Sequence, residues 1–256
     1  MNEIFSNNNL TFTARSPQIK DAQWVSRKVR SFSHLSTTHI APTITKLADN
    51  NPKVFDRFSS QTLVNRYYPK LPEEQRLVKF FSWYKNLVKR MNRARSEWNI
   101  GKKDKFAGVR NILGMFKYEK LGNCGEDTSL AASILRMNGV ENVYIAGITA
   151  NGDWCDHVVC LFNKDGSMFD GKDLRKTIVV DPWVGGSDFA SNMATKYKGL
   201  FIDLLPELKQ NSKIGFNIIE KMDFSDDELC LLRRNYPNLC YPKGERNFMQ
   251  KNEPLN

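Results

Sequence analysis

No run of about 18 apolar residues occurs in this sequence of 256 residues, so we expect no membrane-spanning helix. The first residues, Met1 to Phe5, have neither the basic start nor the apolar core of a secretory signal peptide. Five cysteines, an odd number without paired spacing, do not predict a disulfide framework. Together these absences favour a soluble protein that acts in a reducing cytosol.

The sequence also has few motifs of the kind that bind phosphate, metal ions or nucleic acid. Gly185 and Gly186 most simply form a turn, because no phosphate-binding motif surrounds them. Cys155, His157 and Cys160 lack zinc spacing, and a strand would place His157 and Cys160 on opposite faces. We therefore expect no metal and no cofactor. Without an RNA-binding or zinc-finger signature, nucleic acid is not an expected partner.

The most informative stretch runs from Gly122 to Gly139. Acidic residues follow Cys124 closely and a glycine closes the apolar run, which is the usual punctuation of a helix. Cys124 then lies at the helix N-terminus, where unpaired N–H groups and the helix dipole favour a thiolate, although a buried structural cysteine could occupy the same place. The polar residues form one narrow stripe, so most of this helix should be buried: Glu126, Ser129, Ser133 and Arg136.

Beyond this helix the apolar pattern changes to that of strands. Extended segments are predicted over 140–149, 157–162 and 177–181, with a loop over 150–156. The strand that His157 opens is apolar on both faces, so it should be central in the sheet. Later helices are predicted over 187–197 and from Ser225, which forms a capping box with Glu228.

His157 and Asp181 should meet at one end of this sheet. If their strands pair antiparallel, the start of one lies opposite the end of the other, and the alternation places both side chains on one face. With Cys124 they meet the requirements of an activated thiol. His157 would take the Cys124 proton, and Asp181 would fix the tautomer and orientation of the ring. Backbone N–H groups at Cys124 and Gly125, with the Asn123 side chain, could stabilise an oxyanion.

Other residues near these segments stay open as alternatives. Asp156 could replace Asp181, but adjacent strand residues point to opposite faces. Asp170 and Asp173 lie in the loop between the strands and are further candidates. Trp154 and Trp183 flank the histidine and the aspartate, where they could wall a substrate cleft or pack in the core.

Three segments carry a resemblance to a known family: Gly122-Asn123-Cys124-Gly125-Glu126, Asp156-His157-Val158-Val159 and Val179-Val180-Asp181-Pro182-Trp183. In this order they resemble the transglutaminase-like branch of the papain-like cysteine enzymes, in particular bacterial effector and toxin domains, some of which deamidate glutamine in host proteins. The match covers about residues 104–190. It implies an α+β fold in which a Cys-bearing helix packs on an antiparallel sheet that presents His and Asp. The glutamine upstream of the nucleophile in papain-type proteases has no counterpart, since Tyr118 stands six residues before Cys124.

The sequence therefore predicts a thiol-dependent acyl-transfer enzyme with Cys124, His157 and Asp181 as its triad. The resemblance implies a protein substrate, possessing a glutamine side chain that is deamidated or cross-linked. Two alternatives stay open: a cysteine protease of the same superfamily, and a non-enzymatic basic interaction module. We expect a monomer.

Positive charge is concentrated ahead of the cysteine. Between Arg76 and Arg110, eleven basic residues stand against two acidic ones, so this segment carries +9 of the formal net charge of +10. Two helices are predicted here, over 69–98 and 102–120, and the first has a wide apolar face. Such a segment could bind an acidic protein partner or an anionic membrane surface, or it could be a solvated helix face.

The two ends of the chain carry little pattern. Residues 1–70 are predicted to be mostly disordered or loosely helical, with one short helix over 22–32. The first sixteen residues are half Asn, Ser and Thr, which is typical of a flexible terminus and also of the translocation signal of an effector secreted into a host cytoplasm. We expect a single catalytic domain over 71–242, with its core at 104–190, and a flexible tail over 243–256.

Overall fold

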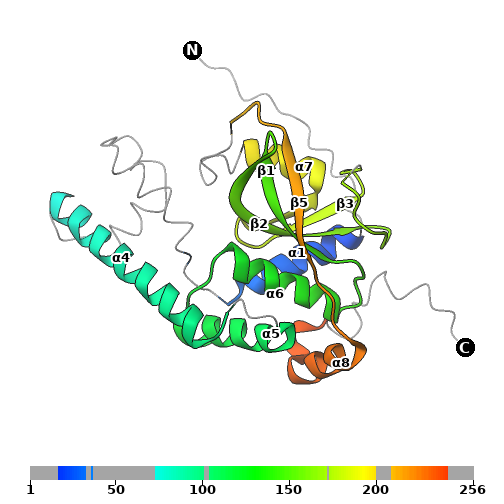
Figure 1. The fold of residues 1–256 in the computed structure, drawn as a ribbon, viewed down its shortest axis with the longest axis horizontal. Helices are drawn as coiled ribbons and strands as arrows, with labels where there is room; N and C mark the ends of the chain where they lie inside the picture. The colour runs from blue at the N-terminus through cyan, green and yellow to red at the C-terminus, as the bar shows by residue number, and fades with distance from the viewer. Residues whose placement is uncertain are drawn as a thin grey trace, which may run out of the picture.

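In the computed structural model of the protein, the residues described are 17–32, 36, 73–100, 104–171, 173–199 and 209–241. They form a mixed fold of helices and one antiparallel sheet, which confirms the predicted α+β class (Figure 1). No helix within these ranges is long and apolar enough to cross a membrane. The predictions for residues 1–16 and for the tail fall outside the described residues.

The sheet has the strand order β4-β3-β2-β1-β5, and every neighbouring pair is antiparallel. β3 has the bounds predicted for it, and β2 lies in the middle, as its apolar pattern indicates. β4 and β5 are not among the predicted strands. Residues 187–189, predicted as the start of a helix, belong to β4, and the helix begins only at Ala190. β5 lies at the edge of the sheet, and the second half of its residues is mostly exposed. The strands are β1 (Tyr144–Ala150), β2 (Asp153–Asn163), β3 (Thr177–Asp181), β4 (Gly186–Phe189) and β5 (Ile214–Lys221).

The turn between β1 and β2 corrects one prediction. Instead of a loop over 150–156, two residues with positive φ, Asn151 (56°) and Gly152 (95°), join the strands. Asn-Gly is the preferred pair for a two-residue hairpin turn, because both positions require positive φ. β2 therefore begins at Asp153, and His157 lies inside the strand rather than at its start.

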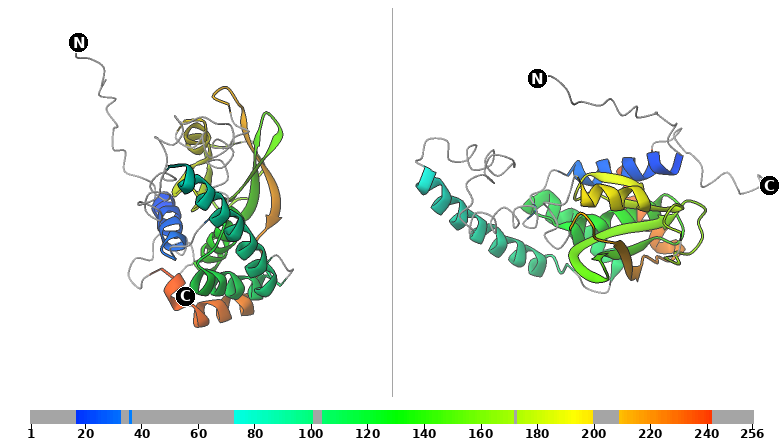
Figure 2. Two further views of the ribbon diagram at one scale, coloured as in Figure 1. Left: turned by 90° about the vertical axis from the view of Figure 1, so that its left-hand side faces the viewer. Right: turned by 90° about the horizontal axis from the view of Figure 1, so that it is seen from above.

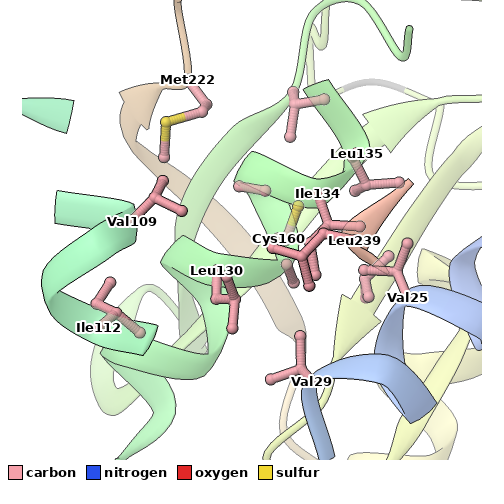
Figure 3. Packing of buried hydrophobic residues seen from close by; sticks show 14 of the residues in the cluster. Val25, Val29, Val109, Ile112, Leu130, Ile134, Leu135, Cys160, Met222 and Leu239 are labelled. Atoms are coloured by element: carbon pink, nitrogen blue, oxygen red, sulfur yellow. The ribbon is translucent and has the colours of Figure 1, made fainter. Parts of the chain in front are cut away.

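Helices cover both faces of the sheet. One face packs against α6 and the elements around it, and the other against α7 (Ala190–Lys198). Figure 3 shows the first of these two cores, with side chains from α1, α5, α6, β2 and the C-terminal elements in contact. The elements of this side are α1 (Pro17–Arg30), α4 (Glu73–Glu97), α5 (Lys105–Gly114) with the π-helical turn η2 (Met115–Glu119), α6 (Cys124–Met137), α8 (Asp226–Asn235) and η4 (Pro237–Leu239).

Helix α1 is an integral part of this core. Its Val25 and Val29 are fully buried among residues of α6 and the sheet. The helix predicted over 22–32 thus exists, begins earlier at Pro17, and contributes to the domain that the sequence places only after residue 71. The Ser225–Glu228 capping box is confirmed, with Ser225 Oγ accepting from the Glu228 N–H at 3.2 Å.

Helix α4 extends away from the body of the fold, with its N-terminal end farthest out (Figure 1, Figure 2). Its C-terminal half is anchored by buried Leu87, Met91 and Ala94. Basic side chains of the opposite face, including Lys85 and Lys89, are exposed. The helix therefore presents most of its charge to solvent while its apolar stripe holds it to the core.

Candidate active site

Cys124 is the first residue of α6 and is partly buried. Asn123 before it has extended backbone angles, φ −127° and ψ −174°, and its N–H donates to Glu126 Oε2 at 2.9 Å. This is the reciprocal contact of a capping box, which fixes where the helix starts. The first N–H groups of α6, including those of Cys124 and Gly125, point out of the helix end, where they have no partners within the helix.

The pairing of β2 with β3 ends near the start of α6. The β2–β3 ladder runs only from Asn163↔Thr177 to Cys160↔Val180. Beyond its end, the Val158 carbonyl accepts a hydrogen bond from Thr128 Oγ1 at 2.9 Å, so the first turn of α6 bonds to β2 where β3 no longer does. Cys124 consequently packs against the core on the α7 side, although most of α6 lies on the opposite face.

His157 lies in an irregular stretch of β2. The register with β1 shifts between Gly147↔Val158 and Thr149↔Trp154, so three residues of β2 lie opposite Ile148 alone. Such bulges bend a strand and redirect its side chains, and they are frequent next to active sites. His157 is 1% exposed and lies on the same side of the sheet as Val159 and Asp181.

The His157 ring is held by a buried carboxylate. Its Nε2 lies 2.7 Å from Asp181 Oδ2, and the Tyr197 hydroxyl donates to the same oxygen at 2.6 Å. The Val184 N–H donates to the other oxygen, Oδ1, at 3.3 Å. Trp183 covers the imidazole, with ring centroids 4.5 Å apart. Contacts on both carboxylate oxygens fix the plane of Asp181 and hence the direction in which the imidazole points.

The electrostatics of the pair favour a protonated His157. Burial alone would lower the pKa of His157, but the charge of Asp181 and its hydrogen bond, followed by the interaction with Cys124, raise it to about 10. The charge of Asp181 therefore favours the protonated ring, in which Nε2 donates to Asp181 Oδ2. Burial and the neighbouring Asp181 charge raise the pKa of Tyr197, which keeps its hydroxyl a donor.

Asp181 contacts Nε2, so the second ring nitrogen is Nδ1. It is buried and makes no hydrogen bond of ordinary geometry within the part of the chain that the structure describes. Cys124 nevertheless acts on the ring, as its effect on the pKa of His157 shows.

The remaining predicted site residues divide into two groups. Open space lies where a Cβ of Gly125 would stand, so this residue is not covered by neighbouring side chains there. Trp154 is 49% exposed and lies over Gly147 on the neighbouring strand, at the surface. Asn123 and Trp183 are instead buried and linked through Ser36, whose Oγ donates to Asn123 Oδ1 and accepts from Trp183 Nε1, both at 3.0 Å. Trp183 therefore packs behind the site rather than walling an open cleft.

The alternative acids do not reach the imidazole. Asp156 and Asp170 are exposed, and Asp173 pairs with the Arg175 guanidinium at 3.1 Å. The carboxylate that contacts His157 is that of Asp181.

Sequence reasoning missed three residues that complete the site. Tyr197 reaches Asp181 from α7, Ser36 reaches Asn123 from beyond α1, and Arg95 of α4 binds Glu126. No local pattern marks any of them, because each acts through one polar atom that a distant element brings into place. Of the residues in these contacts, Glu126 is the one that a sequence pattern marks, because Asn at the N-cap with Glu three residues later is a known capping pair.

A cavity of about 630 Å³ lies between α5, α6 and the end of β5, and its wall includes Gly125, Ser129 and Ser133 but not Cys124. Among the described residues, no group of three or more His, Cys, Asp or Glu side chains is placed to hold a metal ion.

Comparisons with protein-family models, with curated proteins and with solved structures found no match.

Proposed function

We propose that the protein is a thiol-dependent acyl-transfer enzyme with Cys124 as nucleophile, His157 as acid and base, and Asp181 as the residue that orients the ring. The observation that carries this is one arrangement: a buried imidazole bound through Nε2 to a buried carboxylate, with a cysteine at a helix N-terminus close enough to affect the pKa of the ring. A nucleophile, a base and a group that orients the base are the parts that an activated thiol requires.

Acylation would begin from a thiolate and an imidazolium. The Cys124 thiolate attacks the carbonyl carbon of an amide, and the resulting oxyanion lies near the first N–H groups of α6. As the carbon–nitrogen bond breaks, His157 Nδ1 gives its proton to the leaving nitrogen. The products of this step are a thioester on Cys124 and a free amine, or ammonia if the substrate is a primary carboxamide.

Deacylation would reverse these roles. The thioester no longer carries the thiolate charge, which is one of the interactions that raise the pKa of His157. Neutral His157 then takes a proton from water as the water oxygen attacks the thioester, and the thiolate leaves. The overall reaction with water converts the carboxamide to a carboxylate and ammonia; an amine in place of water would give a cross-link.

A glutamine side chain of a protein is the substrate that we propose, with a transglutaminase-like, papain-like core as the finer description of the fold. The support is the resemblance of the three segments around Cys124, His157 and Asp181, together with an antiparallel sheet packed on the Cys-bearing helix. Proteolysis by the same chemistry is the other outcome that the tests distinguish. A host protein fits the resemblance to effector domains.

The reactivity of Cys124 tests the proposal directly. With iodoacetamide at pH 6.5, Cys124 should be alkylated at least about tenfold faster than Cys230, because reaction requires the thiolate and only Cys124 has an imidazolium beside it. Peptide mass spectrometry would follow each cysteine over time. Cys230 is the suitable internal control, since it is exposed and on a helix, whereas Cys155 and Cys160 are buried. Equal rates at Cys124 and Cys230 would exclude an activated thiol.

Helix α4 is proposed as a docking arm for an acidic surface of the protein substrate. It projects from the body of the fold (Figure 2), and its exposed basic side chains leave their charge available for a partner. An anionic membrane is the other kind of surface that this charge would fit. Attraction of either kind weakens as salt rises, because exposed charges are screened.

Charge reversal on α4 should separate docking from chemistry. The triple variant Lys85→Glu, Lys89→Glu and Arg93→Glu alters exposed side chains, so thermal stability should change little. Hydrolysis of a small amide should persist, while kcat/KM for the protein substrate should fall about tenfold or more at low salt. Equal activity of the variant and the unmodified protein on both substrates would show that the arm is only a solvated face.

A further inference from the structure

Arg95 holds the first turn of the catalytic helix from outside the sheet core. It lies near the end of α4, and its Nε and Nη2 donate to the two Glu126 carboxylate oxygens at 2.7 and 2.9 Å. Glu126 is 4% exposed, whereas 38% of the Arg95 side chain remains exposed. A two-point bond between a planar guanidinium and a carboxylate is strong and directional, because both hydrogen bonds are charge-assisted.

The same carboxylate connects Arg95 to the nucleophile. Glu126 Oε2, which accepts from Arg95, also accepts from the N–H of Asn123, the residue before Cys124. A chain of three polar groups thus runs from α4 to the backbone that precedes the thiol. Any movement of the Arg95 guanidinium would be passed to the start of α6.

The charge of Arg95 also reaches the thiol. Burial alone would lower the pKa of Arg95, but the hydrogen bond and charge of Glu126, and then the charges of Cys124 and Asp156, raise it. Charge interactions are mutual, so the guanidinium that an anionic Cys124 stabilises also stabilises that anion. Without Arg95, the buried Glu126 carboxylate would be an uncompensated negative charge beside the nucleophile.

We propose that Arg95 is a positioning residue for Cys124, which holds the first turn of α6 through Glu126 and provides the positive charge that offsets this carboxylate. This inference rests on the proposed role of Cys124 as nucleophile. It makes α4 part of the active site: the helix that carries the docking charge ends in the group that prepares the thiol. The attachment of α4 through Leu87, Met91 and Ala94 keeps the guanidinium in place.

Three single variants of the full chain test the proposal through the alkylation rate of Cys124 by iodoacetamide between pH 5 and 9. Arg95→Met removes the positive charge near the thiol, so the rate at pH 6.5 should fall about tenfold. Glu126→Gln removes the negative charge, but a side-chain oxygen remains that can accept from Asn123 and Arg95, so position is kept and the rate at pH 6.5 should equal or exceed that of the unmodified protein. Arg175→Met is the control: Arg175 also binds a carboxylate, that of Asp173 at 3.1 Å, but it lies between β2 and β3 rather than on α4 or α6, so its loss should leave the rate unchanged.

The opposite directions distinguish this role from a merely structural one. If the ion pair only stabilised the fold, both Arg95→Met and Glu126→Gln would slow the reaction, and that result would overturn the proposal. An unchanged rate in Arg95→Met would overturn it as well. Should Arg95→Met fail to fold by circular dichroism, Glu126→Gln decides alone: a slower reaction rejects the proposal and an equal or faster one supports it.

Failure of this inference is separable from failure of the proposed function. If Cys124 of the unmodified protein reacts no faster than Cys230, the nucleophile itself is wrong. If Cys124 is activated and Arg95→Met leaves its pH profile unchanged, the triad stands and only the role of Arg95 falls.

Discussion

Replacing Cys124 with alanine should lower turnover of the substrate by a factor on the order of 10⁶, because the covalent step cannot occur without the nucleophile. The measurement is a proteomic comparison of eukaryotic cell lysate treated with the unmodified protein and with Cys124→Ala. Sites that change only with the unmodified protein are its substrates. Cys230→Ala is the matched control; it removes an exposed cysteine far from the site and should keep full activity.

The same comparison identifies the reaction. Glutamine converted to glutamate indicates a deamidase, new peptide ends indicate a protease, and glutamine–amine adducts indicate a transglutaminase. Circular dichroism should show that Cys124→Ala is folded. Modifications that appear equally with Cys124→Ala would reject Cys124 as the nucleophile. They would favour the alternative hypothesis, a non-enzymatic basic interaction module.

Replacing Asp181 with asparagine should lower kcat by a factor on the order of 10² to 10⁴. The charge of Asp181 is the largest influence that raises the pKa of His157 against the effect of burial. Without it the buried ring becomes neutral at lower pH, and the thiolate loses its counter-ion. Steady-state rates on a small amide, with the alkylation profile of Cys124, would measure both consequences. Tyr197→Phe keeps the carboxylate and removes only one hydrogen bond, so its loss of activity should be smaller.

The pH dependence of stability provides a second measurement on the same variant. Because folding raises the pKa of His157 from 6.5 to about 10, the folded protein holds a proton that the unfolded chain releases between these values. This contribution to the free energy of unfolding is full below pH 6.5 and is lost as pH rises toward 10. Asp181→Asn should flatten that decline. Full activity in Asp181→Asn with loss in Asp156→Asn or Asp173→Asn would move the orienting role to another carboxylate.

Local pattern was sufficient for the elements that carry Cys124 and Asp181. Helix α6 begins at Cys124 because the residues that start it, Asn123 and Glu126, are neighbours in the chain and bond to each other. β3 ends at Asp181, directly before a proline, and its alternation placed that side chain on the His157 face. These predictions succeeded because the interactions behind them span only a few residues.

Tertiary structure alone decided how Cys124 is placed on the side of the sheet that carries His157 and Asp181. Cys124 reaches the His157 face because the β2–β3 ladder stops at Cys160 and the start of α6 bonds to β2 beyond it. The bulge in β2 is likewise a matter of register with β1, which the composition of one strand does not encode.

The residues that support the proposed triad come from segments that are more distant in the sequence. Tyr197, Ser36 and Arg95 each contribute one polar contact from a separate element, and α1 joins the core although it precedes α6 by about a hundred residues. Helix caps and strand alternation depend on sequence neighbours. The sequence by itself therefore determined the helix that begins at Cys124, the strand that ends at Asp181 and the charged character of α4. A single hydrogen bond between distant segments leaves no periodic trace in either segment, and so only the folded chain shows which group holds which.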